Sequence, residues 1–401
     1  MQICSRISNL HKMETRYIHR ELSSVIEEAY RYFSVITIAG PRQSGKTTLI
    51  RNLFPKLPYY SLENLDVRSF AENDPIAFLN QNPEGMILDE VHNVPTLLSY
   101  IQGIVDEDAD RRFILSGSSQ FAMLKKVTQS MAGRTAVFEL LPMSLSEVHA
   151  IAENMSLDEL LFNGFYPAIY SGRNVPKFLY PSYVRTYLDK DVRDLLQIKD
   201  MMQFHTFTRL CAGRIGSLFK ASELANEVGV SPNTITAWLS VLQASYIVML
   251  LPPYHENTVK RLTKTPKLYF MDTGLACHLL GIDSPEQLAR DKMRGALFEN
   301  FVVTEALKRR YNRGKDSNLY FYRDSNQNEV DLLLLQGNGI SGIEIKSAMT
   351  YHPDFEKALK QLDGWVKTPV LDKAVVYSGK LENTSGNIKL LNYRNMEGMF
   401  V

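Results

Sequence analysis

The chain has 401 residues, of which 45% are hydrophobic and 22% are charged, and its formal net charge is +1. This length exceeds what one hydrophobic core usually organises, so two or three domains are expected. The near-neutral charge excludes a global electrostatic footprint for nucleic acid, and any such binding would depend on local basic patches.

The cysteines and the apolar runs limit the compartments in which the chain is expected. Cys4, Cys211 and Cys277 are scattered, so neither a disulfide framework nor a zinc site is expected, and the cytoplasm is the predicted location. The most apolar run, at 246–251, is far shorter than the ~20 residues that cross a bilayer, so no membrane partner is predicted. The basic N-terminal stretch lacks an apolar segment and is not expected to act as a signal peptide.

The segment VITIAGPRQSGKTTLI, at 35–50, places a β-branched strand directly before a glycine-rich loop and a helical pattern. The loop has the spacing G-x-x-x-x-G-K-T, in the context of strand and helix that a phosphate-binding P-loop requires. Lys46 is expected to reach the β- and γ-phosphates of ATP, and the Thr47 hydroxyl is expected to hold Mg²⁺. The residues predicted to bind the nucleotide through this loop are Gly40, Pro41, Arg42, Gln43, Ser44, Gly45, Lys46, Thr47 and Thr48.

A second apolar strand, MILDE at 86–90, ends in two acidic residues. Because it follows a P-loop, this pattern predicts that Asp89 binds Mg²⁺ through water and that Glu90 polarises the attacking water. A third apolar strand, RFILSGSS, ends in hydroxyl side chains. ATP hydrolysis is therefore assigned to Lys46 and Glu90.

These motifs, taken in order, resemble one known group of proteins. The sequences GPRQSGKTTL, ILDEVHNVPTLL, FILSGSS, SMAGR and LLPMSLSE look like those of the archaeal-ATPase-like AAA+ group of ATP-binding proteins, which carry an uncharacterised C-terminal domain. The resemblance covers nearly the whole chain. It implies an α/β multidomain protein with a P-loop AAA+ core, built on a parallel sheet, at 17–150.

The same resemblance implies roles for residues outside the P-loop. A polar residue at the end of the third strand senses the γ-phosphate in AAA+ proteins, and Ser116 and Ser118 are both candidates. Arg134 stands where AAA+ proteins present an arginine finger to the neighbouring subunit, which implies a homo-oligomer with a hexamer as one candidate. The alternative is that Arg134 simply pairs with a carboxylate of its own chain. Tyr17 and Arg20 fall where relatives pack against adenine.

Residues 151–275 are predicted to form a helical lid followed by a winged helix-turn-helix. In the lid, Arg185 and Asp191 either contact the nucleotide or the next subunit, or belong to a solvated helix face with paired charges. The segment LFKASELANEVGVSPNTITAW has the order helix, glycine turn, helix, and Ser222 and Ser231 are the expected N-caps of the two helices.

The second of these helices is the one predicted to read DNA, with a polar face toward the groove and an apolar face toward the core. The groove-facing residues would be Asn233, Thr234 and Thr236, and the inward ones Ile235, Leu239 and Leu242. The predicted wing, at 250–270, carries cations for phosphate contacts near Tyr254 and Tyr269, and these are Lys260, Arg261, Lys264 and Lys267. Winged helices also couple domains, and Glu223 and Glu227 in the first helix do not favour DNA, so both interpretations stay open.

The last domain, 285–401, is predicted to contain a helix, three strands, a second helix and a further strand. Asp331 lies early in one strand, and Glu344 and Lys346 share one face of the next because strand side chains alternate. With Glu299 on the helix upstream, these residues resemble the signature of the PD-(D/E)xK superfamily, which has a restriction-endonuclease-like fold. The resemblance implies that Asp331 and Glu344 hold Mg²⁺, that Glu299 is an accessory ligand and that Lys346 orients the attacking water.

The same cluster has an alternative interpretation, in which Arg323 and Lys346 neutralise Asp331 and Glu344 in a buried network that only supports the hairpin. Two functions therefore stay open. One is an AAA+ ATPase that acts on DNA, with branched DNA as the first substrate to test and a conditional nuclease at its end. The other is a nucleotide-switched scaffold ATPase whose C-terminal domain is catalytically silent and docks a partner.

Overall fold

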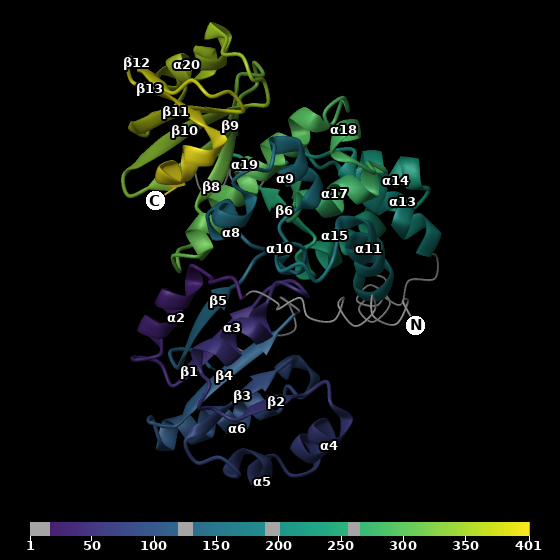
Figure 1. The fold of residues 1–401 in the computed structure, drawn as a ribbon, viewed down its shortest axis with the longest axis vertical. Coiled ribbons are helices and arrows are strands. Elements are labelled where there is room, and N and C mark those ends of the chain that lie inside the picture. Colours follow the sequence, from purple (N-terminus) through teal and green to yellow (C-terminus); the bar gives the residue numbers. More distant parts are fainter. Residues whose placement is uncertain (1–16, 119–130, 189–200, 256–264, 401) are drawn as a thin grey trace, which may run out of the picture.

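The structure is a computed structural model, and it describes residues 17–118, 131–188, 201–255 and 265–400. Three regions follow one another along the longest axis of the molecule (Figure 1). A parallel sheet with helices lies at one end, a helical region lies in the middle and a mixed sheet lies at the other end.

The first region is built on a parallel sheet, as the resemblance implies, and the sheet has five strands in the order β2-β3-β4-β1-β5. The three central strands are almost completely buried, which is why they occur in the sequence as continuous apolar runs. The strands are β1 (Val35–Ala39), β2 (Tyr59–Ser61), β3 (Gly85–Asp89), β4 (Arg112–Gly117) and β5 (Thr135–Glu139). The helices are α2 (Leu22–Ala29), α3 (Lys46–Leu53), α4 (Leu65–Asn73), α5 (Pro75–Asn80) and α6 (Leu97–Glu107), with the 3₁₀ turn η2 (Val91–Asn93).

The middle region is mainly helical. Ser144 and Ser156 open its first two helices through capping boxes with Glu147 and Glu159, a pattern that satisfies two backbone N–H groups at each helix start. The elements are α8 (Leu145–Ala152), α9 (Leu157–Asn163), α10 (Pro167–Tyr170), α11 (Pro176–Tyr183), the π-helical turn η3 (Val184–Leu188), α13 (Met201–Ala212), α14 (Ala221–Val228), α15 (Pro232–Ala244), α17 (Thr273–Leu280) and α18 (Pro285–Leu288).

The predicted pair of helices around the glycine turn is present as α14 and α15. Ser231 caps α15, because its Oγ accepts a hydrogen bond of 3.1 Å from the Thr234 backbone N–H, and Pro232 occupies the first helical position. Gly229 ends α14 with a φ of 78°, which favours glycine. The inward-facing residues Ile235, Leu239 and Leu242 are buried, as predicted.

The prediction that Ser222 caps α14 is wrong. The residue at the N-cap is Lys220, whose backbone is extended and whose side chain makes no capping bond. Its ammonium instead pairs with Glu223 at 2.6 Å, and the helix starts two residues earlier than a cap at Ser222 would place it.

The predicted wing corresponds to a two-stranded antiparallel hairpin, β6 (Val248–Leu251) and β7 (Lys267–Phe270). Lys260, Arg261 and Lys264 lie outside the described residues. Lys267 is 2% exposed, so the prediction that it contacts DNA phosphate is wrong: carboxylates of the same chain surround its ammonium. Tyr254 and Tyr269 are buried as well.

The third region begins with α19 (Arg294–Tyr311) and continues into a six-stranded mixed sheet in the order β12-β13-β11-β10-β9-β8. Strands β8 to β10 are antiparallel, whereas β10, β11 and β13 are parallel. The strands are β8 (Leu319–Arg323), β9 (Glu329–Gln336), β10 (Gly339–Lys346), β11 (Val370–Tyr377), β12 (Asn383–Ser385) and β13 (Ile388–Asn392). The short helices are η4 (Pro353–Glu356), α20 (Lys357–Trp365) and η5 (Tyr393–Phe400).

The middle and C-terminal regions pack as one unit. A single hydrophobic cluster extends from α8 and α9 through α19 to η5, and α19 is buried along most of its length. The segment after β6 also pairs with the edge strand β8, where Tyr254 N donates to Phe321 O at 2.6 Å. The hairpin therefore couples two regions through its backbone. No helix in the described part of the chain is long and apolar enough to cross a membrane.

Candidate functional site

The P-loop connects β1 to α3 at the carboxyl edge of the parallel sheet. Gly45 is the N-cap of α3 and has a φ of +93°, a conformation that favours glycine. A side chain at Gly40 would collide with the carbonyl oxygen of Leu140, which follows β5. Both glycines of the predicted motif are thus required by the turn that presents backbone N–H groups at the start of α3.

Lys46 points back over this loop. Its ammonium donates to the carbonyl oxygens of Gly40 at 2.9 Å and Pro41 at 2.8 Å. Burial lowers the pKa of Lys46, and the carboxylates of Glu90 and Asp89 oppose that shift. The lysine is therefore held at the mouth of the P-loop with both predicted acids nearby.

Asp89 accepts hydrogen bonds from several hydroxyl groups. Thr47 Oγ1 donates to its Oδ2 at 2.6 Å and the Tyr59 hydroxyl donates to the same oxygen at 2.8 Å, while Ser116 Oγ donates to Oδ1. The two residues predicted to hold Mg²⁺, Thr47 and Asp89, are thus in direct contact. Ser116 is the sensor candidate that touches Asp89, and the backbone N–H of Ser118 donates to Glu90 at 3.0 Å.

Glu90 follows β3 in a left-handed backbone conformation, with φ 53° and ψ 47°. For a non-glycine residue this conformation is uncommon and costs energy, and such residues cluster at functional sites. Burial would raise the pKa of Glu90, but the His92 imidazole, 3.2 Å from its carboxylate, and the Lys46 ammonium bring the pKa to about 2. The carboxylate is therefore ionised at neutral pH. His92, two residues beyond Glu90, and Tyr59 belong to no motif that predicts this site from the sequence.

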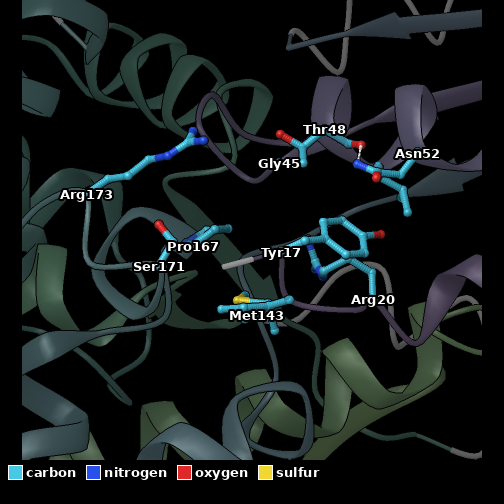
Figure 2. Close-up of a pocket in the computed structure, with 11 residues that line it drawn as sticks. Tyr17, Arg20, Gly45, Thr48, Asn52, Met143, Pro167, Ser171 and Arg173 are labelled. Atoms are coloured by element: carbon cyan, nitrogen blue, oxygen red, sulfur yellow. Dashed lines mark hydrogen bonds between the residues drawn. The ribbon is translucent and has the colours of Figure 1, made fainter. Parts of the chain in front are cut away.

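Two adjoining cavities flank the start of α3. The phosphate-side cavity, of about 510 Å³, is lined by Lys46, Thr47 and Glu90 among others. The base-side cavity, of about 260 Å³, is lined by Tyr17, Arg20, Asn52 and further residues. Both share Gly45 and Thr48 on one wall and residues of the α10–α11 segment on the other (Figure 2).

The wall opposite the P-loop was missed by the sequence analysis. Pro167, Ser171 and Arg173 come from α10 and the turn after it, more than a hundred residues along the chain from the P-loop. In Figure 2 the Arg173 side chain extends toward the P-loop. Among the described residues, none forms a hydrogen bond or ion pair with it. Its sequence context, a Gly-Arg turn between helical segments, carried no signal for a nucleotide site.

Arg20, predicted to pack against adenine, is 3% exposed and braces the P-loop. Its nitrogens donate to Ser44 O at 2.7 Å, to Leu141 O at 2.7 Å and to Glu147 at 2.9 Å. It also lines the base-side cavity beside Tyr17. Its contact with adenine stays a prediction.

Arg134 directly precedes β5, so it lies at the amino ends of the parallel strands, whereas the P-loop lies at their carboxyl ends. Its guanidinium binds the Asp106 carboxylate of α6 through two hydrogen bonds, one of them 2.9 Å long. Both side chains are partly exposed. The pairing matches the alternative that the sequence left open, and the arginine finger stays a prediction about a neighbouring subunit. Of the two lid residues, Arg185 is exposed and Asp191 lies outside the described residues.

At the other end of the molecule, Asp331 of β9 lies beside Glu344 and Lys346 of β10. Lys346 Nζ lies 2.5 Å from Glu344 and 3.3 Å from Asp331, and the Ile345 N–H also donates to Asp331 at 2.8 Å. Burial and the nearby Asp331 raise the pKa of Glu344 to about 8, against the opposing effect of Lys346. The three predicted residues therefore form one coupled cluster.

Glu299 belongs to a neighbouring set of contacts. It accepts from the Tyr269 hydroxyl at 2.6 Å and pairs with Lys267 at 3.2 Å, and Lys267 also pairs with Glu329 at 2.6 Å. Arg323 pairs with Glu329 at 3.2 Å, so the alternative that it neutralises Asp331 or Glu344 directly is wrong. Within the described part of the chain, no three His, Cys, Asp or Glu side chains are grouped closely enough to hold a metal ion. The C-terminal metal site stays a prediction.

A parallel sheet, a P-loop after β1 and an acidic pair at the end of the apolar strand β3 define a P-loop ATPase domain. Residues 32–149 match the family described as an AAA domain, which agrees with this geometry. Residues 154–286 and 294–396 match two families described as domains of unknown function, DUF8612 and DUF4143. The chain therefore contains an AAA-type P-loop ATPase domain followed by two regions that match families without an assigned activity.

Several proteins resemble the chain over most of its length. Uncharacterized proteins of Mycobacterium bovis and Mycobacterium tuberculosis are each 29% identical over 368 residues, which cover 90% of this chain and 80% of theirs. An uncharacterized protein of Methanocaldococcus jannaschii is 22% identical over 336 residues, covering 75% and 72%. Among solved structures, the Walker-type ATPase of Pyrococcus abyssi aligns with a TM-score of 0.46 and 13% identity, over 66% of this chain and 97% of that one.

Proposed function

We propose that the protein is a Mg²⁺-dependent ATP hydrolase that binds its nucleotide between the P-loop domain and the middle helices. The observation that carries the proposal is the contact between Thr47 and Asp89, with Lys46 and the ionised Glu90 beside it. Hydroxyl and carboxylate oxygens are the ligands that Mg²⁺ prefers. When bound between Thr47 and Asp89, the ion would neutralise charge on the phosphates.

Lys46, Glu90 and Ser116 would each have a different role in hydrolysis. Lys46 would bind the terminal phosphates from the P-loop, where its ammonium already contacts the loop carbonyls. Glu90 would accept a proton from the attacking water. The Ser118 N–H and His92 hold the Glu90 carboxylate in position. Ser116 would sense the γ-phosphate through its bond to Asp89.

The test is a comparison of nucleotide binding and ATP hydrolysis in three variants. Lys46→Ala should lose nucleotide binding, whereas Glu90→Gln should bind ATP and fail to hydrolyse it. Glu72→Gln, on the exposed face of α4 outside both cavities, is the matched control and should hydrolyse at the wild-type rate. Wild-type turnover in Glu90→Gln would show that the acid has been assigned wrongly.

A second candidate function is action on DNA, with branched DNA as the first substrate and cleavage at Asp331, Glu344 and Lys346. The observation that favours it is the position of these three side chains on neighbouring strands within hydrogen-bonding distance. Asn233 and Thr236 are exposed on α15, where they could contact a groove. Under this candidate function, the C-terminal domain would have a restriction-endonuclease-like fold, and Asp331, Glu344 and Glu299 would hold Mg²⁺.

Its test uses labelled duplex, single-stranded and four-way-junction DNA in Mg²⁺ or Mn²⁺, with and without ATP. Cleavage by the wild type that is lost in Asp331→Ala would establish a nuclease. Binding without cleavage, weakened by salt and by the double variant Asn233→Ala/Thr236→Ala, would establish an ATP-controlled DNA-binding protein.

If neither binding nor cleavage occurs, the alternative is a nucleotide-switched ATPase whose C-terminal domain docks a protein partner. The pairing of Lys267 and Lys346 with the surrounding carboxylates favours that alternative, because each ammonium already neutralises two acids.

A further inference from the structure

The base-side cavity has mostly apolar walls. Ile18, Leu49, Met143 and Pro167 supply them, together with the ring of Tyr17. Among the described residues that line this cavity and not the phosphate-side one, those with polar groups are Tyr17, Arg20 and Asn52. Three of the five N–H groups of Arg20 already donate to protein oxygens, and a guanidinium has no acceptor, so Asn52 is the amide here that offers a base edge both a donor and an acceptor.

The orientation of the Asn52 amide is determined by its neighbour. Its Nδ2 donates to the carbonyl oxygen of Thr48 at 2.7 Å, one turn earlier in α3, as the dashed line in Figure 2 shows. A carbonyl accepts and cannot donate, so the amide nitrogen must face Thr48. The second N–H of Nδ2 and the oxygen Oδ1 remain as an adjacent donor and acceptor on a side chain that lines the cavity.

This donor–acceptor pair matches one edge of adenine. Adenine presents its 6-amino donor next to the N7 acceptor, and asparagine binds that pair through two hydrogen bonds. Guanine presents two acceptors, O6 and N7, on the same edge, so Oδ1 would face another acceptor. The phosphates would lie at the start of α3 beside Thr48, which puts the base one turn further along the helix, where Asn52 is.

We propose that Asn52 is the residue that selects adenine, by binding the 6-amino group and N7 of the base in the cavity of Tyr17, Leu49 and Pro167. The inference rests on the proposed function, because it takes the phosphate site at Lys46 as given. It adds a specificity determinant outside the P-loop motif. A bidentate pair of this kind gives roughly 10- to 100-fold discrimination against the wrong base.

The test varies the protein and the ligand together. Dissociation constants are measured by calorimetry for the wild-type chain and for Asn52→Ala, with ATP, GTP, inosine triphosphate and purine riboside triphosphate. The last two ligands carry a 6-oxo group and no 6-substituent, respectively. Asn73→Ala is the matched control, because Asn73 is an exposed helical asparagine that also bonds to the residue four positions earlier, Ser69, and lies outside both cavities.

Wild type should bind ATP roughly 10- to 100-fold more tightly than the other three triphosphates. Asn52→Ala should lose that preference because its ATP affinity falls, while its affinity for purine riboside triphosphate, which offers N7 but no 6-amino donor, should fall by less than its ATP affinity. Asn73→Ala should bind the four triphosphates with the same order of affinities as the wild type.

Three results would overturn the inference. Equal weakening of all four ligands in Asn52→Ala would mean that the side chain only supports α3 through Thr48. Unchanged affinities in that variant, or no preference for ATP in the wild type, would mean that Asn52 does not read the base. In either of the last two cases the ATPase proposal still holds if the protein binds and hydrolyses ATP. A wild type that binds no triphosphate would overturn both the ATPase proposal and the role of Asn52.

Discussion

At the scale of single residues, the candidate nucleotide site depends on side chains that no local motif contains. Asp89 and Glu90 follow a recognisable apolar strand, but the groups that orient them come from elsewhere. Tyr59 donates to Asp89 from the neighbouring strand, and the N–H of Ser118 donates to Glu90 from the end of β4. Orientation by such partners is what allows a carboxylate to act at a fixed position.

Arg173 is expected to contact the phosphates from the opposite wall. Replacing it with alanine should weaken ATP binding roughly tenfold, because hydrogen bonds to charged groups are among the stronger ones. Binding of adenosine should be unchanged, and calorimetry with both ligands measures the difference. Lys177→Ala removes a nearby exposed cation that lines neither cavity and is the control. Equal loss for ATP and adenosine would instead point to a disturbed α10–α11 segment.

Arg134 offers a test of oligomerisation. If it acts as a finger on a neighbouring subunit, Arg134→Ala should slow hydrolysis while nucleotide affinity is kept, and wild-type specific activity should rise with protein concentration. Asp106→Asn breaks the same ion pair but keeps the arginine, so it should hydrolyse normally. Normal hydrolysis in Arg134→Ala would mean that Arg134 only forms its surface ion pair with Asp106, and such pairs usually add little stability.

At the scale of elements, α19 connects the two ends of the molecule. Near its start, Arg294 donates to Ser347 O, just after Lys346, and Glu299 contacts Lys267 and Tyr269. Near its end, Glu305 accepts from Leu145 N at 2.7 Å and Lys308 donates to Met143 O at 2.9 Å. Because Met143 also lines the base-side cavity, this helix reaches from the C-terminal cluster to the candidate nucleotide site.

The buried pair of Glu305 and Lys308 should be sensitive to loss of one partner. Lys308→Met leaves the Glu305 carboxylate buried without its cation and should lower the free energy of unfolding by about 3–5 kcal/mol. The double variant Glu305→Gln/Lys308→Met keeps an acceptor for Leu145 N, removes both charges and should recover much of that loss. Urea unfolding measures both. A double variant as unstable as Lys308→Met would mean that packing, and not unpaired charge, causes the loss.

Predicted and observed elements agree at most of the local patterns, with the cap expected at Ser222 as an exception. The strand, loop and helix around Lys46, the cap at Ser231 and the turn at Gly229 all depend on neighbouring residues, so the sequence predicts them. The wing was the least successful prediction, because Lys267 counts as a basic residue in the sequence but is buried between Glu299 and Glu329 in the fold. Its partners lie 32 and 62 positions away, where no local pattern could connect them.

At the scale of the whole molecule, the nucleotide would bridge two regions. One wall of each cavity comes from the P-loop and α3, and the other comes from the α10–α11 segment. A ligand between them stabilises the arrangement that holds both walls together, since binding to the folded state adds stability by mass action.

A non-hydrolysable ATP analogue should therefore protect both walls. At a hundred times its dissociation constant it should add about 2.7 kcal/mol to the free energy of unfolding. It should also slow hydrogen exchange in α3 and in the segment from Pro167 to Asn174. Lys46→Ala should show neither effect. Protection of α3 alone would show that the nucleotide binds the P-loop domain without engaging the middle helices.

The sequence by itself determined the P-loop, the acidic pair, the parallel α/β class of the first region and the order of elements from α19 to β11 in the last one, but not β12, β13 and η5. Each of these follows from spacing and periodicity within a short stretch of chain. The tertiary structure decided which residues oppose the P-loop, that Arg20 donates to Ser44 O, and that Glu299 pairs with Lys267 and Tyr269 beside the Asp331 cluster. These depend on how distant segments pack around one shared hydrophobic core, and neither spacing nor composition records which distant side chains meet there.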